Sequence, residues 1–573
     1  MILGLLAGLW QTPLLASAAS EAVAPFYNYP LSAVNPSLKK VPFPGGRGTD
    51  QLVLYDARSQ RPRTETNEFG YEVTVMNGRV NHAEGSNSVI PPKGKGFVLS
   101  GHGKASRWLL QHASLGADIV VDEVHQQVSA RQGAHLKEYQ LRALLNDLRY
   151  VLMPVEKTKA RLLLMQASRL DDATLQREAN PRIEEQLQSL QQRAWQSLGS
   201  FRRPNMHAVW LRPEARNRRE IANTLDDLKK SGINTVFVET FVHGHTIYPS
   251  NVFETYGIEN NQQYPKYVLG NEATADYLQL WLEEAHKRGM QYHAWLQLFY
   301  VGHTRIHGDE GPILRAKPHW ANRMLQYSNQ AKPQPSIVEQ GYYFLDPANP
   351  EVRAFHTALV QDLVSRYPVD GIQLDYIRYP ASPSGATGMG QYWGYTPIAL
   401  EQFRLNTGIN ALSLTPESSQ WATWLRYKAN MVNNTVETLV NTARTTAEEQ
   451  GRSIAISADI FPDHKKSYAG KQQEWPLWIQ QGWLDFICPM TLATTPQSVA
   501  EAVKEMRQAG KRSNFPVVAG VFSPFYGSDA HALYLQLAMA QRRGANGFAI
   551  FTAANLTPTM REQLSLWQEG FED

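Results

Sequence analysis

The chain has 573 residues, far more than the ~150 residues of an average domain, so two or three domains are expected. Hydrophobic residues make up 43% and charged residues 19%, a composition that excludes wholesale disorder. Lysine and arginine total 56 against 53 aspartates and glutamates, and the net charge of +3 gives no support for a nucleic-acid partner. The single cysteine, Cys488, excludes an intrachain disulfide and any multi-cysteine metal site.

The first 19 residues, MILGLLAGLWQTPLLASAA, are almost entirely apolar and end in a small-x-small pattern. This pattern predicts a secretory signal peptide or an N-terminal anchor over residues 1–19. It therefore predicts export to the periplasm, the cell envelope or the extracellular space. No later stretch offers the ~20 uninterrupted apolar residues of a membrane-spanning helix, so no membrane span is expected beyond this segment.

Residues 25–130 are expected to form a small α+β module. The Asn77-Gly78 pair lies inside the alternating segment YEVTVMNGRV, which is a strong β-hairpin signal. Farther along, VIPPKGKGFVLSGHG predicts a strand, and it resembles the closing part of the phosphodiester glycosidase domain. Residues 135–200 carry apolar side chains at helical spacing and predict a helical connector.

The pattern of the sequence changes at residue 204. Short apolar runs, separated by helical stretches, lie at residues 206–212, 235–240, 291–297, 371–379, 453–461, 486–491, 516–522 and 547–552. Buried strands that alternate with helices in this way over residues 204–573 predict an α/β fold of the (β/α)8 TIM-barrel type. A doubly wound open sheet is the alternative, but no glycine-rich phosphate loop follows the first strand.

Three of the predicted strands end in carboxylates. Side chains alternate along a strand, and this alternation turns Asp375, Glu239 and Asp459 toward the inside of the barrel. A carboxyl group in an otherwise apolar strand has to be solvated, paired or functional, because burying a lone charge costs several kcal/mol. Structural roles stay open as well: Glu239 would pair with Arg378 or a histidine, and Asp459 would cap the loop that follows it.

Carboxylates across an aromatic-lined cleft are what cleavage of a glycosidic bond requires. One donates a proton to the leaving oxygen, and the other attacks the anomeric carbon or activates water. Residues near the strand ends are expected to contact the sugar: His243, His245, Tyr248, His293, Trp295, Gln297, Arg378, Tyr379, Trp393 and Trp475. The three histidines and Glu239 also permit a metal site, but sugar contacts are the preferred interpretation, and no metal or cofactor is expected.

Five ordered motifs carry a more specific signal. In chain order they are INTVFVETFVHGHTIYPS, EEAHKRGMQYHAWLQ, LDPANPEVRAF, YPVDGIQLDYIRYP and EWPLWIQQGWLDFICPMT. Together they resemble the glycosyl hydrolase-like 10 family over about residues 204–555. The resemblance implies a (β/α)8 barrel that cleaves polysaccharide, and some members of the family are similar to hydrolases of peptidoglycan glycan strands that lack peptides.

The motif that contains Asp375 is also similar to motifs of two other sugar-cleaving barrels. In α-amylase-type enzymes the matching aspartate is the nucleophile and the acid ends the next strand, which implies Asp459 here. Chitinase-type enzymes carry the run DGxDxDxE, whereas this chain has Gln373 and Ile377 at two of the acidic positions. A chitinase-type mechanism would therefore need another carboxylate, such as Glu239, as the proton donor.

The sequence thus predicts an exported glycoside hydrolase, retaining or inverting, that acts on a cell-envelope or extracellular polysaccharide. Asp375 is assigned as the nucleophile or its stabiliser, and Glu239 or Asp459 as the acid/base. A non-catalytic carbohydrate-binding protein on the same barrel is the rival interpretation, and a metal-dependent enzyme of another kind is a third.

Overall fold

The computed structural model describes residues 25–36, 50–60, 64, 70–85, 89–114, 116–131, 205–259, 276–305, 310–339, 341–382, 386–491, 496–509, 514–522 and 530–569. Residues 1–19 and 135–200 lie outside this part of the chain, so the signal peptide or anchor and the helical connector stay predictions. Within the described part, no helix combines the length and the apolar character that crossing a membrane requires.

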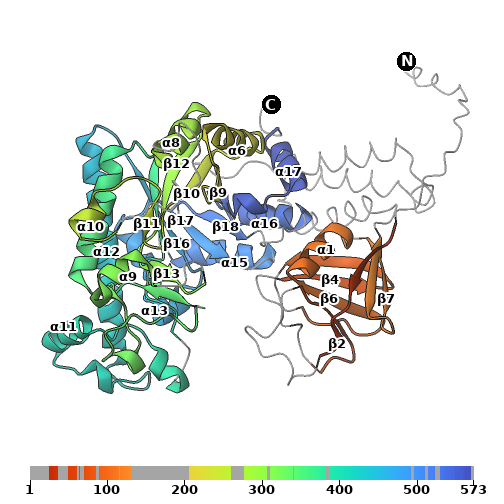
Figure 1. Ribbon diagram of the computed structural model, residues 1–573, viewed down its shortest axis with the longest axis horizontal. Helices are drawn as coiled ribbons and strands as arrows, with labels where there is room; N and C mark the ends of the chain where they lie inside the picture. Colours follow the sequence, from red (N-terminus) through yellow and green to blue (C-terminus); the bar gives the residue numbers. More distant parts are fainter. Residues whose placement is uncertain are drawn as a thin grey trace, which may run out of the picture.

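The small module is built on an eight-stranded sheet with the order β1-β8-β7-β5-β4-β6-β3-β2 (Figure 1). Its elements are β1 (Tyr27–Pro30), β2 (Ala33–Val34), β3 (Leu52–Asp56), β4 (Gly70–Met76), β5 (Arg79–Gly85), β6 (Gly96–His102), α1 (Lys104–His112), β7 (Asp118–Asp122) and β8 (Gln127–Arg131). The predicted hairpin joins β4 to β5, and Asn77 and Gly78 have the left-handed φ values of 52° and 76° that a type I′ turn requires. Helix α1 packs on the sheet through Ala105, Trp108 and Leu109.

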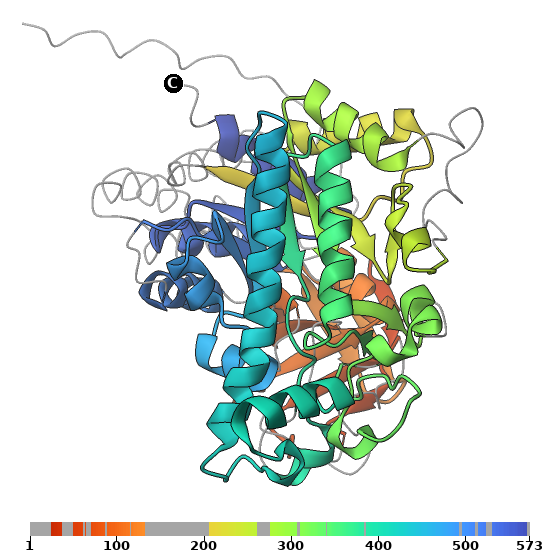
Figure 2. The same cartoon turned by 90° about the vertical axis from the view of Figure 1, so that its left-hand side faces the viewer.

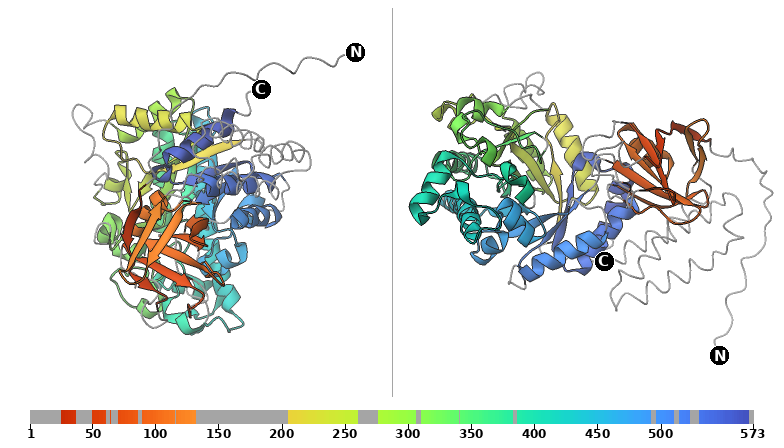
Figure 3. Two further views of the ribbon diagram at one scale, coloured as in Figure 1. Left: turned by 90° about the vertical axis from the view of Figure 1, so that its right-hand side faces the viewer. Right: turned by 90° about the horizontal axis from the view of Figure 1, so that it is seen from below.

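Eight parallel strands of the second half close into a barrel, which confirms the predicted fold. They are β9 (Met206–Leu211), β10 (Thr235–Val242), β12 (Gln291–Gln297), β15 (Gly371–Asp375), β16 (Ala455–Ile460), β17 (Phe486–Thr491), β18 (Val518–Phe522) and β19 (Gly547–Phe551). Each pairs with the next barrel strand along the chain, and the ring closes where β19 pairs with β9. Figure 3 shows this barrel from two further sides.

Helices cover the outside of the barrel. They include α6 (Arg218–Lys230), α8 (Tyr277–Lys287), α10 (Pro350–Arg366), α12 (Trp421–Glu449), α14 (Trp475–Gln480), α15 (Pro496–Ala509), α16 (Ala530–Arg542) and α17 (Pro558–Glu569). Figure 2 shows the two long helices α10 and α12 side by side on one flank. Capping defines where helices begin: the side chain of Asn217 accepts a hydrogen bond from the N–H of Glu220 at the start of α6, and Asn349 plays the same part before α10.

Additional elements follow the carboxyl ends of several barrel strands. They are β11 (His245–Thr246), α7 (Val252–Thr255), β13 (Tyr300–His303), α9 (Gly311–Ala316), the 3-10 turns η3 (Pro318–Trp320) and η4 (Leu325–Tyr327), β14 (Tyr342–Phe344), η5 (Ala386–Gln391), α11 (Pro397–Thr407), η6 (Ala411–Ser413), α13 (His464–Lys471) and η7 (Ala553–Asn555). The segment around α11 has a small core of its own, in which Tyr395 and Phe403 pack against Trp424 of α12. These insertions surround the carboxyl-terminal end of the barrel.

Side chains of the barrel strands alternate between two cores. Val236 and Ile372 point outward into the core shared with the helices, as the alternation predicts. Trp210, Phe237 and Phe486 point inward and fill the interior of the ring. The inward positions at the carboxyl ends of the strands are therefore the ones that border the mouth of the barrel.

Candidate active site

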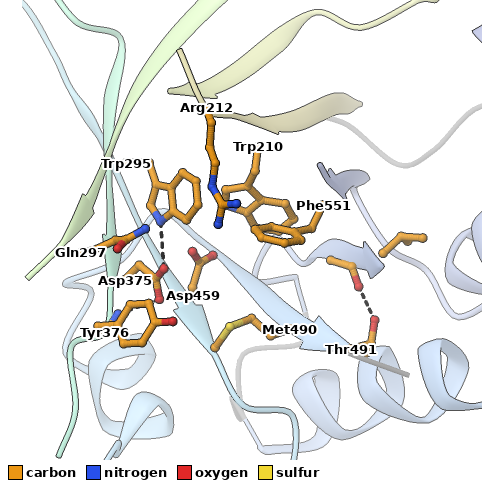
Figure 4. A pocket seen from close by; sticks show the side chains of 12 residues that line it. Trp210, Arg212, Trp295, Gln297, Asp375, Tyr376, Asp459, Met490, Thr491 and Phe551 are labelled. Carbon is orange, nitrogen blue, oxygen red and sulfur yellow. Dashed lines mark hydrogen bonds between the residues drawn. The ribbon is translucent and has the colours of Figure 1, made fainter. Parts of the chain in front are cut away.

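A cavity of about 140 Å³ lies at the carboxyl ends of the barrel strands (Figure 4). Its lining consists of Trp210, Arg212, Trp295, Gln297, Asp375, Tyr376, Asp459, Met490, Thr491, Gly520, Val521 and Phe551. This is the end at which (β/α)8 barrels carry their active sites. Four of the residues that the sequence predicts for the site, Trp295, Gln297, Asp375 and Asp459, thus lie in one cavity.

Asp375 is the last residue of β15 and is held by two N–H donors. The indole Nε1–H of Trp295 donates to its Oδ2 over 2.9 Å, and the backbone N–H of Tyr376 donates to its Oδ1 over 2.6 Å. Tyr376 has φ of 50°, so the chain adopts a left-handed conformation directly after Asp375. Burial raises the pKa of Asp375 to about 6, although both hydrogen bonds oppose the rise by stabilising the ionised form.

Asp459, in the neighbouring strand β16, lies beside Asp375 with less support (Figure 4). It is only 2% exposed, and its Oδ1 has no hydrogen-bond partner among the described residues. Burial, followed by the negative charge of Asp375, raises the pKa of Asp459 well above its usual value. The following helix is capped instead by Asp463, whose side chain accepts from the N–H of Lys466. Burial and the charge of Asp375 thus both disfavour the ionised form of Asp459.

Glu239 in β10 is paired with an arginine, but not with the one considered from the sequence. Its Oε1 lies 3.4 Å from Nε of Arg212, and it accepts a hydrogen bond of 2.8 Å from Nε2 of Gln297. Arg212 and Gln297 both line the cavity. Since a guanidinium and an amide N–H both stabilise a carboxylate, Glu239 is better suited to hold these two side chains in place than to give up a proton.

Arg378 instead forms an ion pair with Glu339, in the loop that leads to β14. Its Nη2 lies 2.6 Å from Oε1 of Glu339, while the backbone N–H of Ala381 donates to Oε2 over 2.8 Å. The Arg378 guanidinium carbon is 5.0 Å from the ring centre of Tyr376, the residue that donates to Asp375. Burial tends to raise the pKa of Glu339, but Arg378 outweighs it and holds that pKa below its usual value.

The three predicted histidines are placed differently from one another. His243 follows β10 and packs edge-on against Tyr300, with 4.9 Å between ring centres, and His245 begins β11. His293 lies deeper in the barrel, 5.4 Å from the ring centre of Phe237, and burial lowers its pKa to about 4. Among the described residues, no three His, Cys, Asp or Glu side chains are grouped so that they would hold a metal ion.

Four aromatic residues that the sequence suggested for sugar contact pack in the protein interior instead. Tyr248, Tyr379, Trp393 and Trp475 are at most 1% exposed, and none of them lines the cavity. Tyr248, for example, packs against a tyrosine of the helix layer, and the indole N–H of Trp475 donates to a backbone carbonyl. Large aromatic side chains near strand ends serve the layer between barrel and helices as readily as a cleft.

The aromatic side chains that do line the cavity, besides Trp295, are Trp210, Tyr376 and Phe551. Trp210 was not predicted, and neither was Arg212, although both follow from the alternation of side chains along β9. Trp210 points into the barrel interior, so the next inward position is Arg212 at the carboxyl end. The same reasoning that located Asp375 would have found them.

A closed (β/α)8 barrel whose mouth holds two interacting carboxyl groups beneath aromatic rings defines the protein as a glycosyl hydrolase-like barrel. The chain belongs to the glycosyl hydrolase-like 10 family, whose model matches residues 204–526. That range contains the carboxyl groups of Glu239, Asp375 and Asp459. The match does not reach the small module, where the resemblance to the phosphodiester glycosidase domain is not shown.

Relatives with known names each match about half of the chain. Glycosyl hydrolase DigH of Escherichia coli is 27% identical over 272 residues, which are 46% of this chain and 56% of DigH. Glycosyl hydrolase YngK of Bacillus subtilis is 25% identical over 283 residues, 48% of each chain. The chain therefore spans about half the length of the curated relatives that it matches. Among solved structures, the PgaB (BpsB) glycoside hydrolase domain from Bordetella bronchiseptica has a TM-score of 0.43 at 13% identity and covers 63% of this chain and 98% of its own.

Proposed function

We propose that the protein is an exported glycoside hydrolase that cleaves a cell-envelope or extracellular polysaccharide. Asp459 is the general acid, and Asp375 is the nucleophile or the carboxylate that stabilises the developing positive charge. The observation that carries the proposal is the unequal support of two adjacent buried carboxyl groups: two N–H donors reach Asp375, whereas Oδ1 of Asp459 has no partner among the described residues.

Glycosidic cleavage requires this inequality, because one carboxyl group has to be protonated while the other is ionised. Burial makes both ionisations unfavourable, and the first charge to form suppresses the second. The proton therefore stays on Asp459, where it is available to the leaving oxygen. Glu239 is assigned a positioning role, since it holds Arg212 and Gln297 at the rim of the cavity.

Sugar binding is assigned to the aromatic lining. The faces of sugar rings are apolar enough to stack on indole and phenyl rings, and Trp295, Trp210 and Phe551 supply such surfaces around the two carboxyl groups (Figure 4). Trp295 has a second role, because its indole N–H also holds the carboxyl group of Asp375 in its orientation.

Peptidoglycan glycan strands are the first candidate substrate. The apolar segment over residues 1–19, which predicts export, and the membership of the glycosyl hydrolase-like 10 family support a target in the cell envelope. Fractionation of cells that express the full chain tests the export part: recovery in the cytoplasmic fraction alone would contradict it.

The test of the activity is mass spectrometry of products. Purified protein and its Asp375→Asn variant are incubated with peptide-free glycan strands, chitin oligomers and α-glucans. We expect new, shorter saccharides from the glycan strands with the wild type and none with the variant. If no saccharide is cleaved while calorimetry detects binding, the protein is a carbohydrate-binding barrel and the proposed activity is rejected.

A further inference from the structure

A second and larger cavity adjoins the candidate active site. Its volume is about 860 Å³, and its lining comes from residues 462–465, from residues 490–491 and from α15 between Ser498 and Ala509. Met490 and Thr491, at the carboxyl end of β17, belong to the lining of both cavities. The two cavities therefore share part of their lining at the carboxyl end of β17.

The second cavity is a groove between two helices that follow adjacent barrel strands. One side comes from the start of α13, which follows β16, and the other from α15, which follows β17. Along α15 the lining runs from Ser498 to Ala509, which corresponds to about 16 Å at the rise of an α-helix. The groove is thus elongated along α15.

The chemistry of this groove differs from that of the catalytic cavity. Most of its polar lining consists of groups that exchange hydrogen bonds with hydroxyls: carboxylates such as Glu501, the ammonium of Lys465 and the amide of Gln508. His464 and Glu505 pair across the groove from opposite helices. Among the described residues that line it, none is a phenylalanine, tyrosine or tryptophan, whereas the catalytic cavity has four such side chains, Trp210, Trp295, Tyr376 and Phe551.

The two volumes indicate what this groove holds. Small-molecule sites in proteins usually enclose about 300–1,000 Å³. The catalytic cavity, at about 140 Å³, is smaller than this range, and the groove, at about 860 Å³, lies within it. A substrate that placed one ring against Trp295 would have to extend beyond the catalytic cavity, and the groove shares Met490 and Thr491 with that cavity.

We propose that the groove between α13 and α15 binds the further sugar units of a linear, hydroxyl-rich polysaccharide whose scissile unit lies in the catalytic cavity. This inference rests on the proposed function and adds to it the place where the distant units of the polysaccharide bind. Binding energy from the distant units then contributes to cleavage at the carboxyl groups, so efficiency rises with chain length.

The test compares two tryptophan substitutions on one helix. Glu501 and Lys504 are both exposed on α15, but only Glu501 lines the groove. Peptide-free glycan strands, fractionated by length, serve as substrates. We expect Glu501→Trp to lower kcat/KM for the longest strands about tenfold relative to the shortest, because the indole occupies the groove. Lys504→Trp should keep the chain-length dependence of the wild type. A Glu501→Trp variant with the wild-type dependence overturns the proposal.

Binding separates this inference from the proposed activity. Calorimetric titration of the Asp375→Asn protein with the same length series measures the affinity for each strand length without turnover. We expect the affinity to increase with strand length, and we expect this increase to disappear when Glu501→Trp is added. That result supports sugar binding in the groove even if no strand is cleaved. Affinity independent of length overturns it even if cleavage occurs. Gln508→Trp, on the same lining, is the substitute if Glu501→Trp does not fold.

Discussion

The mouth and the deeper interior of the barrel both bury titratable side chains, with different consequences. At the mouth, Asp375 and Asp459 border a cavity, whereas His293 lies below among the rings of Phe237 and Phe486. Burial raises the pKa of the two carboxyl groups and lowers that of His293, so it favours the neutral form in every case. In the packed interior this neutrality serves packing alone. Next to a cavity it leaves an acidic proton where a substrate can reach it.

The pKa shifts also determine how the buried groups at the mouth and in the deeper interior make stability depend on pH. Asp375 has a pKa of about 6 in the folded protein against an ordinary value of 3.8, so its contribution to stability is complete below pH 3.8 and is lost as pH rises through 6. His293 has a folded pKa of about 4 against 6.5, so its contribution is complete above pH 6.5 and is lost as pH falls through 4. Substitutions of Asp375 and of His293 should therefore change the pH dependence of stability in opposite directions.

Asp375→Asn should cause the largest loss of activity. The amide keeps the size of the side chain but neither attacks nor stabilises the anomeric carbon, so turnover should fall on the order of 10³-fold or more. At pH 7 the variant should also unfold at a higher temperature than the wild type, because it removes a buried carboxylate whose pKa is raised. Initial rates and calorimetry measure the two effects. Near-normal turnover would reject the assignment.

Asp459→Asn should have the next largest effect, and the effect should depend on the leaving group. Without the acid, turnover of natural glycans should fall about 10²- to 10⁴-fold, whereas aryl glycosides with acidic phenols as leaving groups should lose much less. The alkaline limb of the pH–rate profile should disappear as well. Glu239→Gln is the matched comparison: if it shows the leaving-group dependence and Asp459→Asn does not, the acid is Glu239.

The part of the site that the sequence predicts is the part that depends on local geometry. An inward position in a strand follows from counting residues, and this located Trp295, Gln297, Asp375 and Asp459. Whether an aromatic residue after a strand faces a cavity or a second layer of packing depends on long-range contacts. Trp393 illustrates this: its surroundings belong to the large core between barrel and helices, which no local pattern specifies.

Glu339 shows why the sequence did not predict other contacts of the site. It lies 39 residues before Arg378 in the chain, in a loop without periodicity, and only the fold brings the two together. From the sequence, Glu239 was considered as a partner of Arg378, but in the structure the partner is Glu339. Spacing alone carries no information about pairings across an insertion of this kind.

Glu339→Gln should have a moderate effect at the mouth. Burial raises the pKa of Asp375, and Arg378 is a cation that opposes the rise; Glu339 partly neutralises that cation. Without the Glu339 charge, the acidic limb of the pH–rate profile should move to lower pH, and kcat should fall about tenfold as the turn at Tyr376 loosens. Glu351→Gln, which changes an exposed carboxylate outside the cavity, should leave the profile unchanged. An unchanged limb in Glu339→Gln would contradict the positioning role.

His293→Leu should have the smallest effect on activity and a clear effect on acid stability. Leucine is close in size to histidine and suits the apolar rings around it, so kcat should stay within about twofold of the wild type. Between pH 6.5 and 4 the unfolded wild type binds a proton at His293 that the folded protein does not bind. This difference lowers the free energy of unfolding of the wild type by about 3 kcal/mol, and leucine removes the loss. Denaturant titrations at pH 7 and pH 4.5 should therefore show a smaller loss of stability for the variant. A loss of activity equal to that of Asp459→Asn, in a folded variant, would mean that the deeper interior takes part in the chemistry and that the contrast between the two ends does not hold.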